Sequence, residues 1–343
     1  MKYLIYVFII LVVFTATSGV ASVSGGIIKI AQDTEPLGIA MENYDYPYEV
    51  KFMELSLEGE DVRMAFMDIQ PISTYNGENI LLLHGKNFFG AYWERTIEFL
   101  AVQGYRVIVP DQVGFGKSSK PDIQYSFHLL ARNTKQLLEE LDVDQVTVVG
   151  HSMGGMLATR FALMYPQTTK RLVLENPIGL EDYRLKVPYT SVHSAYENIL
   201  GYTEKGIRDY HRTYYVKWED KYEEYAQVHY RWTLSGEYPR LAWVSAKTFE
   251  MVYSQPVLYE FPNLTVPTLL IIGQEDRTTL GRGQVTPEVL ATLGQYPELG
   301  EKTAASIPDC TLIEMHGVGH IPHLEAFEFF QDALINFLNQ SSR

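Results

Sequence analysis

The chain has 343 residues, of which 46% are hydrophobic and 20% are charged, as is ordinary for a folded protein. Its formal net charge at pH 7 is −14, from 28 basic and 42 acidic side chains. This excess of negative charge repels phosphate backbones, so we expect no nucleic-acid partner. Because Cys310 is the single cysteine, no intramolecular disulfide can form, and stability must come from a buried core.

The first 21 residues have the layout of a secretory signal peptide. One lysine precedes an apolar run over residues 3–14, and small residues follow around Gly19 and Ala21. The run is too short to cross a bilayer comfortably, so we expect cleavage after residue 21 and export to the periplasm or the medium. The alternative is an uncleaved anchor, which would hold the chain at a membrane.

The pattern that follows an N-terminal extension over residues 22–47 is that of an α/β protein. Residues 49–69 alternate apolar and polar side chains on both sides of "EGED", which predicts a β-hairpin. A series of short apolar runs comes next, each followed by a segment of helical character, at residues 79–85, 105–111, 145–152, 170–177, 267–273 and 311–317. Strands that are buried on both faces and alternate with helices predict a parallel sheet covered on both sides.

This regular alternation breaks once, between Pro177 and Pro267. Residues 180–262 contain no convincing strand, but they hold 13 of the 24 tyrosines and three of the four tryptophans. Their helical pieces mix charged and aromatic residues, so we expect a helical cap that lies over the edge of the sheet. The core is then formed by two parts of the chain, residues 48–179 and 263–343.

Ser152 lies in the pentapeptide G-H-S-M-G, between a valine-rich run and a helical pattern. This context fits the G-x-S-x-G nucleophile elbow, a turn so sharp that glycine is needed at Gly150 and Gly154. The turn exposes the serine oxygen at a helix N-terminus, where free N–H groups favour negative charge. We therefore predict that Ser152 is a nucleophile. The alternative is a plain packing motif that joins a strand to a helix.

A base and an acid follow Ser152 in the chain order that is typical of this elbow. Asp276 comes just after a predicted strand, and His320 lies in a glycine-flanked loop after the last one. A serine nucleophile needs both, so we predict that His320 takes its proton and that Asp276 orients the imidazole. Glu275 stays open as an alternative acid, and His316 and His323 as alternative bases.

An oxyanion formed at Ser152 needs two N–H donors. We predict the backbone N–H of Met153, directly after the nucleophile, and that of Lys86, in the loop after the third strand, with Asn87 as second choice. The Lys86 ammonium is unusual next to an apolar pocket, and we expect it to point to solvent. We interpret His84 as a structural hydrogen-bonding residue.

The chain resembles the α/β-hydrolase superfamily in five segments: LLLHG (81–85), DQVGFGKSS (111–119), GHSMGG (150–155), GQEDRT (273–278) and GVGHIPHLE (317–325). The similar branch includes epoxide hydrolases, haloalkane dehalogenases, ring-cleavage-product hydrolases and many esterases. The resemblance implies an eight-stranded, mostly parallel sheet with helices on both faces, a helical cap after the sixth strand, and no cofactor. Epoxide hydrolases and dehalogenases of this branch use an aspartate nucleophile, and ring-cleavage hydrolases usually carry asparagine where this chain has His151.

These observations predict a serine hydrolase that cleaves a carboxylic ester of a small-to-medium apolar or aromatic substrate through an acyl-enzyme intermediate. Hydrolysis of a carbon–carbon or amide bond by the same triad stays open, as does a non-catalytic ligand-binding role. We expect a small-molecule substrate, no metal and no cofactor. Segment 278–310 is longer than usual in the similar family, and we expect it to add a helix beside the mouth of the site.

Overall fold

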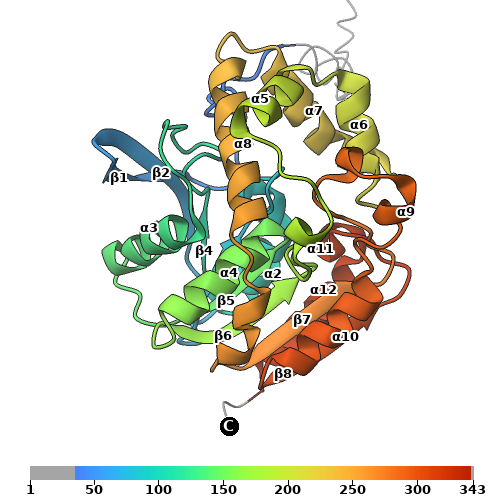
Figure 1. Cartoon of the computed structure of the whole chain (residues 1–343). Coiled ribbons are helices and arrows are strands. Elements are labelled where there is room, and N and C mark those ends of the chain that lie inside the picture. The colour runs from blue at the N-terminus through green and yellow to red at the C-terminus, as the bar shows by residue number, and fades with distance from the viewer. Residues whose placement is uncertain (1–34, 341–343) are drawn as a thin grey trace, which may run out of the picture. The chain divides into compact units, whose positions relative to one another are not determined.

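A central sheet of eight strands organises the chain, of which the computed structural model describes residues 35–340 (Figure 1). The strands are β1 (Lys51–Leu57), β2 (Glu60–Ile69), β3 (Asn79–Leu83), β4 (Arg106–Pro110), β5 (Val146–His151), β6 (Thr169–Glu175), β7 (Thr268–Gly273) and β8 (Cys310–Met315). Their order in the sheet is β1-β2-β4-β3-β5-β6-β7-β8. Pairing is antiparallel where β2 meets β1 and β4, and parallel elsewhere. The predicted eight-stranded, mostly parallel sheet is therefore confirmed.

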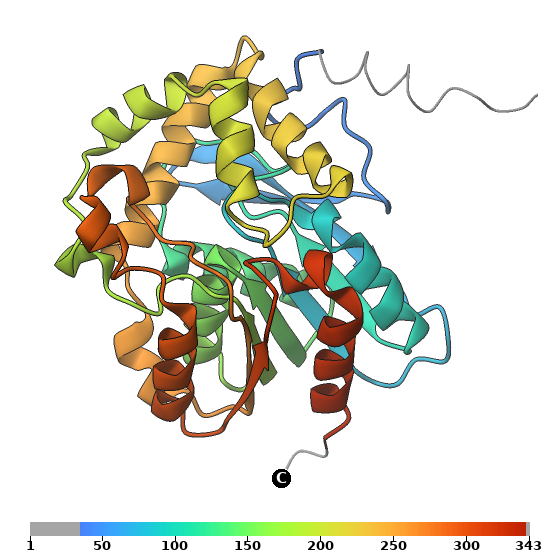
Figure 2. The same ribbon diagram turned by 90° about the vertical axis from the view of Figure 1, so that its right-hand side faces the viewer.

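Both faces of the sheet are covered by apolar layers, because successive side chains of a strand point to opposite sides. In β3, Leu81 and Leu83 join one buried cluster, whereas Ile80 and Leu82 join the other. The first face is covered by α3 (Phe127–Glu140), α4 (Met153–Met164) and α10 (Tyr296–Ser306), and the second by α2 (Glu94–Val102) and α12 (Phe327–Leu338) (Figure 2). Strands of this kind need apolar residues on both sides, which explains the continuous apolar runs in the sequence.

The stretch between β6 and β7 carries four α-helices, which lie above the sheet in Figure 1. They are α5 (Val192–Leu200), α6 (Glu204–Arg212), α7 (Glu223–Thr233) and α8 (Tyr238–Ser254). Side chains of α5, α7 and α8 form an apolar cluster that also takes in Leu37 and Met41 from the N-terminal extension. Phe89, from the loop after β3, packs into the same cluster and so connects these helices to the core.

Segment 278–310 contains two helices with different positions. The four-residue α9 (Pro287–Leu290) lies next to a small apolar cluster formed with Tyr183 and Val187. The longer α10 packs on β7 and β8 and serves as the crossover helix that a parallel pair of strands requires. Most of the helical residues of segment 278–310 therefore belong to α10 and cover the sheet. The remaining helical pieces are η1 (Gly90–Trp93), η2 (Tyr183–Leu185), η3 (Asp220–Tyr222), η4 (Leu258–Asn263), η5 (Arg282–Gln284) and α11 (Pro322–Glu325).

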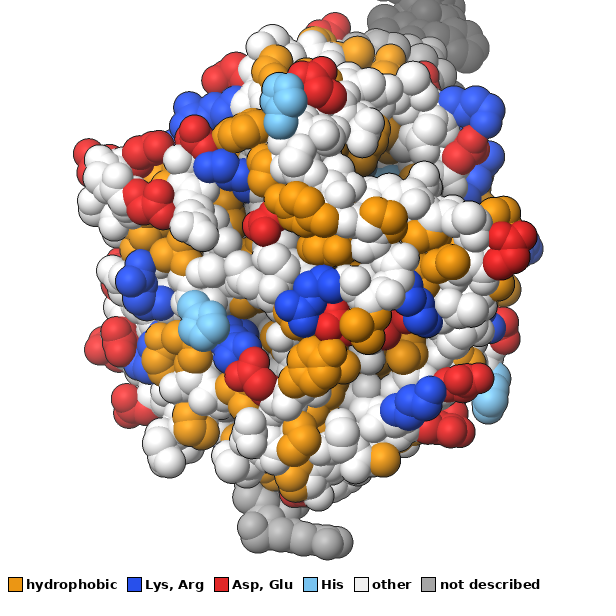
Figure 3. Space-filling view, viewed as in Figure 1, with side chains coloured by type: hydrophobic (Ala, Val, Ile, Leu, Met, Phe, Trp, Pro, Cys, Tyr) orange, Lys and Arg blue, Asp and Glu red, His pale blue; other side chains and the backbone are white. Residues whose placement is uncertain are grey.

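The predicted signal peptide over residues 1–21 lies outside the described residues and stays a prediction. Among the helices of residues 35–340, none combines the length and the hydropathy that crossing a bilayer requires. On the face drawn in Figure 3, basic and acidic side chains are scattered among apolar ones.

Candidate active site

Ser152 occupies a strained turn between β5 and α4. Its φ and ψ angles are 57° and −121°, a conformation that residues other than glycine rarely adopt. The two flanking glycines leave room for it. A Cβ atom on Gly150 would lie 2.2 Å from the carbonyl oxygen of Gly154, and a Cβ on Gly154 would lie 2.2 Å from the carbonyl oxygen of Leu83. The turn therefore has the backbone requirements of the nucleophile elbow.

Ser152, His320 and Asp276 form one hydrogen-bonded chain. The distance from Ser152 Oγ to His320 Nε2 is 3.0 Å, and the distance from His320 Nδ1 to Asp276 Oδ2 is 2.6 Å. Ser152 is 7% exposed, and the other two residues are 1% exposed. With its proton on Nδ1, the imidazole accepts the serine hydroxyl at Nε2. This arrangement can draw a proton from Ser152 when the oxygen attacks an electrophile.

Asp276 is held in place by two further donors, neither of which was anticipated from the sequence. Asn176 Nδ2 donates to Asp276 Oδ2 at 2.9 Å, and the backbone N–H of Thr278 donates to Oδ1 at 2.7 Å. Burial works to raise the pKa of Asp276, but the charge of His320 and these hydrogen bonds outweigh it, so the pKa lies below its ordinary value. Asp276 is therefore an anion that is fixed from three directions.

Asn176 is itself constrained. Its φ angle is 37°, and its Oδ1 accepts the backbone N–H of Gly273 at 2.9 Å, at the end of β7. The only signal in the sequence was its position, directly after the last residue of a buried strand, where site residues of parallel sheets gather.

The alternative acid and bases are not part of the hydrogen-bonded chain of Ser152, His320 and Asp276. Glu275 is exposed, although it is next to Asp276 in the sequence. His316 is exposed just after β8, and His323 is bound to Glu175. Of the acids and bases considered from the sequence, only Asp276 and His320 join the hydrogen-bonded chain of Ser152 in the described structure.

His151 fixes the loop that carries His320. Its Nε2 donates to the backbone carbonyl of His320 at 2.9 Å, and its Nδ1 accepts the hydroxyl of Tyr92 at 3.0 Å. That tyrosine oxygen in turn accepts the backbone N–H of Gly85 at 3.1 Å. Burial lowers the pKa of His151 well below its ordinary value, so the ring is neutral and can both donate and accept. His151 therefore positions the backbone of His320.

A buried pair, Glu175 and His323, lies behind His151. Glu175 Oε1 accepts His323 Nδ1 at 2.9 Å and the backbone N–H of His323 at 2.8 Å. The ring of Trp93 stacks on His323, with the ring centroids 4.0 Å apart. Burial raises the pKa of Glu175 to about 7 and lowers the pKa of His323 well below its ordinary value. The pair therefore carries no net charge under mildly acidic conditions.

The two predicted oxyanion donors belong to backbone beside Ser152. Met153 is the first residue of α4, where N–H groups have no partner within the helix. A Cβ on Gly85 would lie 3.2 Å from Ser152 Cβ, so the backbone that leads into Lys86 passes directly by the serine. His84 has the structural role expected of it, since its Nε2 accepts the backbone N–H of Gln112 at 3.1 Å.

The expectation that the Lys86 ammonium points to solvent is wrong. Lys86 Nζ donates to Ser245 Oγ of α8 at 3.0 Å. The reason is that α8 lies beside the loop after β3 and offers the Ser245 hydroxyl to the partly buried side chain. Sequence reasoning could not place α8 over this loop.

A cavity of about 40 Å³ lies beside Ser152. It is lined by Lys86, Asn87, Phe88, Ser152, Ile178, Tyr210, Tyr214, Thr278, Thr279 and Leu280, and none of these residues is acidic. Tyr214 stacks on the His320 ring at a centroid distance of 5.0 Å, and its carbonyl oxygen accepts the backbone N–H of His320 at 2.7 Å. Within residues 35–340, no group of three or more His, Cys, Asp or Glu side chains is placed to hold a metal ion.

The sheet, the elbow and the hydrogen-bonded chain at its edge define the class of protein, and comparisons with known proteins agree. A family model described as "alpha/beta hydrolase fold" matches residues 78–199. The crystal structure of a probable hydrolytic enzyme from Pseudomonas aeruginosa PAO1 is 45% identical, with a TM-score of 0.88, and the match covers 90% of this chain and 100% of that chain. The chain therefore belongs to the α/β-hydrolase fold family and is a hydrolase of this fold.

Two further relatives match to different extents. A 2-hydroxy-6-oxo-6-(2'-aminophenyl)hexa-2,4-dienoic acid hydrolase from Metapseudomonas resinovorans is 28% identical over 77% of this chain and 85% of its own length. An uncharacterized protein from Mycobacterium tuberculosis is 41% identical over 105 residues, and this match spans 31% of this chain and 30% of that protein.

The Glu175 pair predicts a specific pH dependence of stability. The folded-state pKa of Glu175 is raised from 4.5 to about 7, so the folded protein keeps a proton that the unfolded chain releases. The stability contributed by this proton is fully present below pH 4.5 and is lost as pH rises through 7. Between pH 5 and pH 8 we expect the free energy of unfolding of the wild type to fall by about 1–3 kcal/mol relative to that of Glu175→Gln. Urea unfolding of both proteins measures this difference.

The matched control is Glu314→Gln, which changes an exposed glutamate of β8. Its unfolding free energy should follow that of the wild type at every pH. If Glu175→Gln also ran parallel to the wild type, the buried carboxyl would not carry the proton assigned to it.

Proposed function

We propose that this protein is a serine hydrolase that cleaves a carboxylic ester through an acyl-enzyme intermediate. The observation that carries the proposal is the continuous hydrogen-bonded chain from Ser152 through His320 to Asp276, which starts at a strained elbow. The enclosed backbone N–H groups beside the serine support the same chemistry, because acyl transfer passes through a tetrahedral oxyanion.

In the first half of the reaction, Ser152 Oγ attacks the ester carbonyl carbon as His320 Nε2 takes the hydroxyl proton. The backbone N–H groups of Lys86 and Met153 stabilise the oxyanion. When the tetrahedral intermediate collapses, the bond to the alcohol oxygen breaks and His320 returns the proton to that oxygen. The alcohol leaves, and the acyl group stays on the serine.

In the second half, water repeats the attack on the acyl-serine with His320 as the base, and the acid is released with Ser152 restored. Asp276 accepts the hydrogen bond from the His320 Nδ1–H group throughout, so it fixes the tautomer and offsets the charge of the imidazolium. Asn176 and His151 do not react themselves. Asn176 holds the Asp276 carboxylate, and His151 holds the loop that carries His320.

The cavity supports a small substrate. Its volume of about 40 Å³ disfavours a long acyl chain, and its walls combine aromatic and apolar side chains with Tyr210 of α6 and Tyr214. We therefore propose short-to-medium or aromatic esters as the substrate class.

Hydrolysis of a carbon–carbon bond is the second candidate. The observation that favours it is the likeness to the dienoic acid hydrolase from Metapseudomonas resinovorans. The same serine, histidine and aspartate would serve. Turnover of a 2-hydroxy-6-oxo-dienoic acid, with no turnover of any ester, would decide for this candidate.

Ser152→Ala is expected to abolish ester turnover and labelling by a fluorophosphonate, because the nucleophile is removed. The fold should persist, since the change deletes one hydroxyl and no core contact. The measurements are the rate on the best p-nitrophenyl ester, the extent of labelling and the thermal midpoint. Wild-type turnover by a folded Ser152→Ala protein would refute the proposed nucleophile.

Asp276→Asn is expected to lower kcat by about 10⁴-fold, because the amide favours the wrong tautomer of His320. The neighbouring Glu275→Gln is the matched control and should stay within about threefold of the wild type, since Glu275 is exposed. Steady-state kinetics of both variants on one ester provides the comparison. The opposite ranking would move the acid role to Glu275.

Acyl-chain length provides a test of the enclosed pocket. We expect kcat/KM to peak at short or medium acyl chains, or at benzoyl esters, and to fall toward palmitate, because the cavity beside Ser152 is small. The measurement is kcat/KM across p-nitrophenyl esters from acetate to palmitate. An optimum at palmitate with activation at an oil–water interface would contradict the proposed substrate class.

A further inference from the structure

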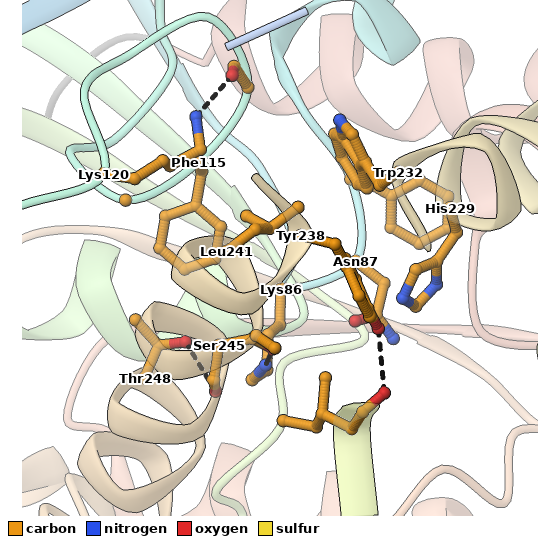
Figure 4. A pocket seen from close by; sticks show the side chains of 15 residues that line it. Lys86, Asn87, Phe115, Lys120, His229, Trp232, Tyr238, Leu241, Ser245 and Thr248 are labelled. Atoms are coloured by element: carbon orange, nitrogen blue, oxygen red, sulfur yellow. Dashed lines mark hydrogen bonds between the residues drawn. The ribbon is translucent and has the colours of Figure 1, made fainter. Parts of the chain in front are cut away.

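A second cavity, of about 50 Å³, adjoins the one at Ser152. The two share Lys86, Asn87 and Phe88 as walls, and the second extends between the core and α8. Figure 4 shows that the ends of the Lys86 and Ser245 side chains lie together in it. The two cavities therefore adjoin at the wall formed by Lys86, and the end of this side chain lies in the second cavity, which we call the recess.

The Lys86 ammonium in this recess has no negative partner. Its hydrogen bond goes to the neutral Ser245 hydroxyl, and within residues 35–340 no carboxylate lies within ion-pair distance of it. The residues that line both cavities include no Asp or Glu. Burial lowers the pKa of Lys86 to about 8, so most of the side chain is still charged at pH 7. A partly buried cation without a counter-ion is unfavourable, and a bound anion would stabilise it.

The two other basic residues that line the recess, Lys120 and His229, call less strongly for an anionic partner. Lys120 donates its ammonium hydrogens to the carbonyl oxygens of Gly116 and Ser118 at 2.7 and 2.6 Å. His229 is neutral at pH 7, because burial and the nearby Lys86 charge lower its pKa to about 4. Lys86 is therefore the lysine of the recess whose ammonium has the fewest hydrogen-bond partners, a single neutral hydroxyl.

The donors in the recess suit a carboxylate. Lys86 Nζ uses one of its three hydrogens on Ser245, and the Ser245 hydroxyl accepts that bond while keeping its own hydrogen. Together they offer charge-assisted hydrogen bonds to one anionic group. The volume of about 50 Å³ suits a group of a few atoms rather than a long chain.

The Lys86 side chain also connects the recess to the surroundings of Ser152. Its backbone passes beside Ser152, and its four-carbon stem leads to Nζ in the recess. An acyl group whose carbonyl lies at Ser152 could therefore carry a carboxylate to Nζ if a short chain separated the two.

We propose that the recess at Lys86 and Ser245 binds a carboxylate of the substrate, so that the preferred substrates are monoesters of short dicarboxylic acids. This proposal rests on the ester hydrolysis proposed for Ser152 and names its substrate class. The negative net charge of the chain does not oppose it, because the local charge at the recess is positive.

The test compares monoethyl glutarate, which carries one carboxylate, with ethyl pentanoate, a neutral ester of the same acyl length. The measured quantity is the ratio of their kcat/KM values within each protein, so any general change in activity cancels. Lys86→Met keeps the backbone N–H and most of the stem but removes the charge. We expect the wild type to prefer the glutarate ester and Lys86→Met to lower the ratio by 10- to 100-fold.

Lys302→Met is the matched control, since it removes an exposed lysine from α10. Its ratio should equal that of the wild type. An unchanged ratio in Lys86→Met, together with turnover of both esters, would overturn the carboxylate site and leave the ester hydrolysis standing.

Glutarate binding separates the two proposals when no ester is turned over. Calorimetric titration of the wild type with glutarate should show binding, and Lys86→Met should weaken it by at least tenfold. If neither ester reacts but glutarate still binds through Lys86, the ester hydrolysis fails and the site stands. If the wild type does not bind glutarate, the site is refuted. Should Lys86→Met not fold, Lys86→Gln provides the same comparison.

Discussion

Backbone contacts at two glycines hold the turn at Ser152, and the other parts of the site are arranged around that turn. Gly150 faces the carbonyl of Gly154, and Gly154 faces the end of β3, each without space for a Cβ. Because β3, β5 and α4 meet without intervening side chains, the loop after β3 is forced to pass beside the serine. The proposed oxyanion donors and the Lys86 recess both depend on this close approach.

The remaining groups come from neighbouring strand ends on the same edge of the sheet. The segments after β6, β7 and β8 supply Asn176, Asp276 and His320 in turn. Each is hydrogen-bonded to the next element, so the buried polar atoms satisfy one another at low solvent exposure. Such a network is favourable only when its members are all present, since an unpaired buried group is costly.

The strands, and the three residues of the hydrogen-bonded chain at Ser152, were predictable because each leaves a local pattern. A strand buried on both faces is a short apolar run, and Ser152, Asp276 and His320 follow in a characteristic order next to glycines or strand ends. Asn176 also follows a strand end, but its role depends on a hydrogen bond to a residue 100 positions later, which no local pattern indicates. The direction of the Lys86 ammonium could not be predicted for a similar reason. Its surroundings are set by α8, and no local feature of the sequence places that helix over the loop.

The contact between Tyr214 and the histidine loop has a consequence for how this protein can change during evolution. The carbonyl of Tyr214 receives the N–H of His320, and it approaches Gly319 so closely that a Cβ there would lie 2.4 Å away. Since a backbone carbonyl is common to all residues, point substitutions along this part of the cap can alter ligand preference without releasing the histidine. Insertions or deletions between α6 and η3 would shift that carbonyl. Divergence of specificity is therefore open to changes of residue but restricted in changes of length.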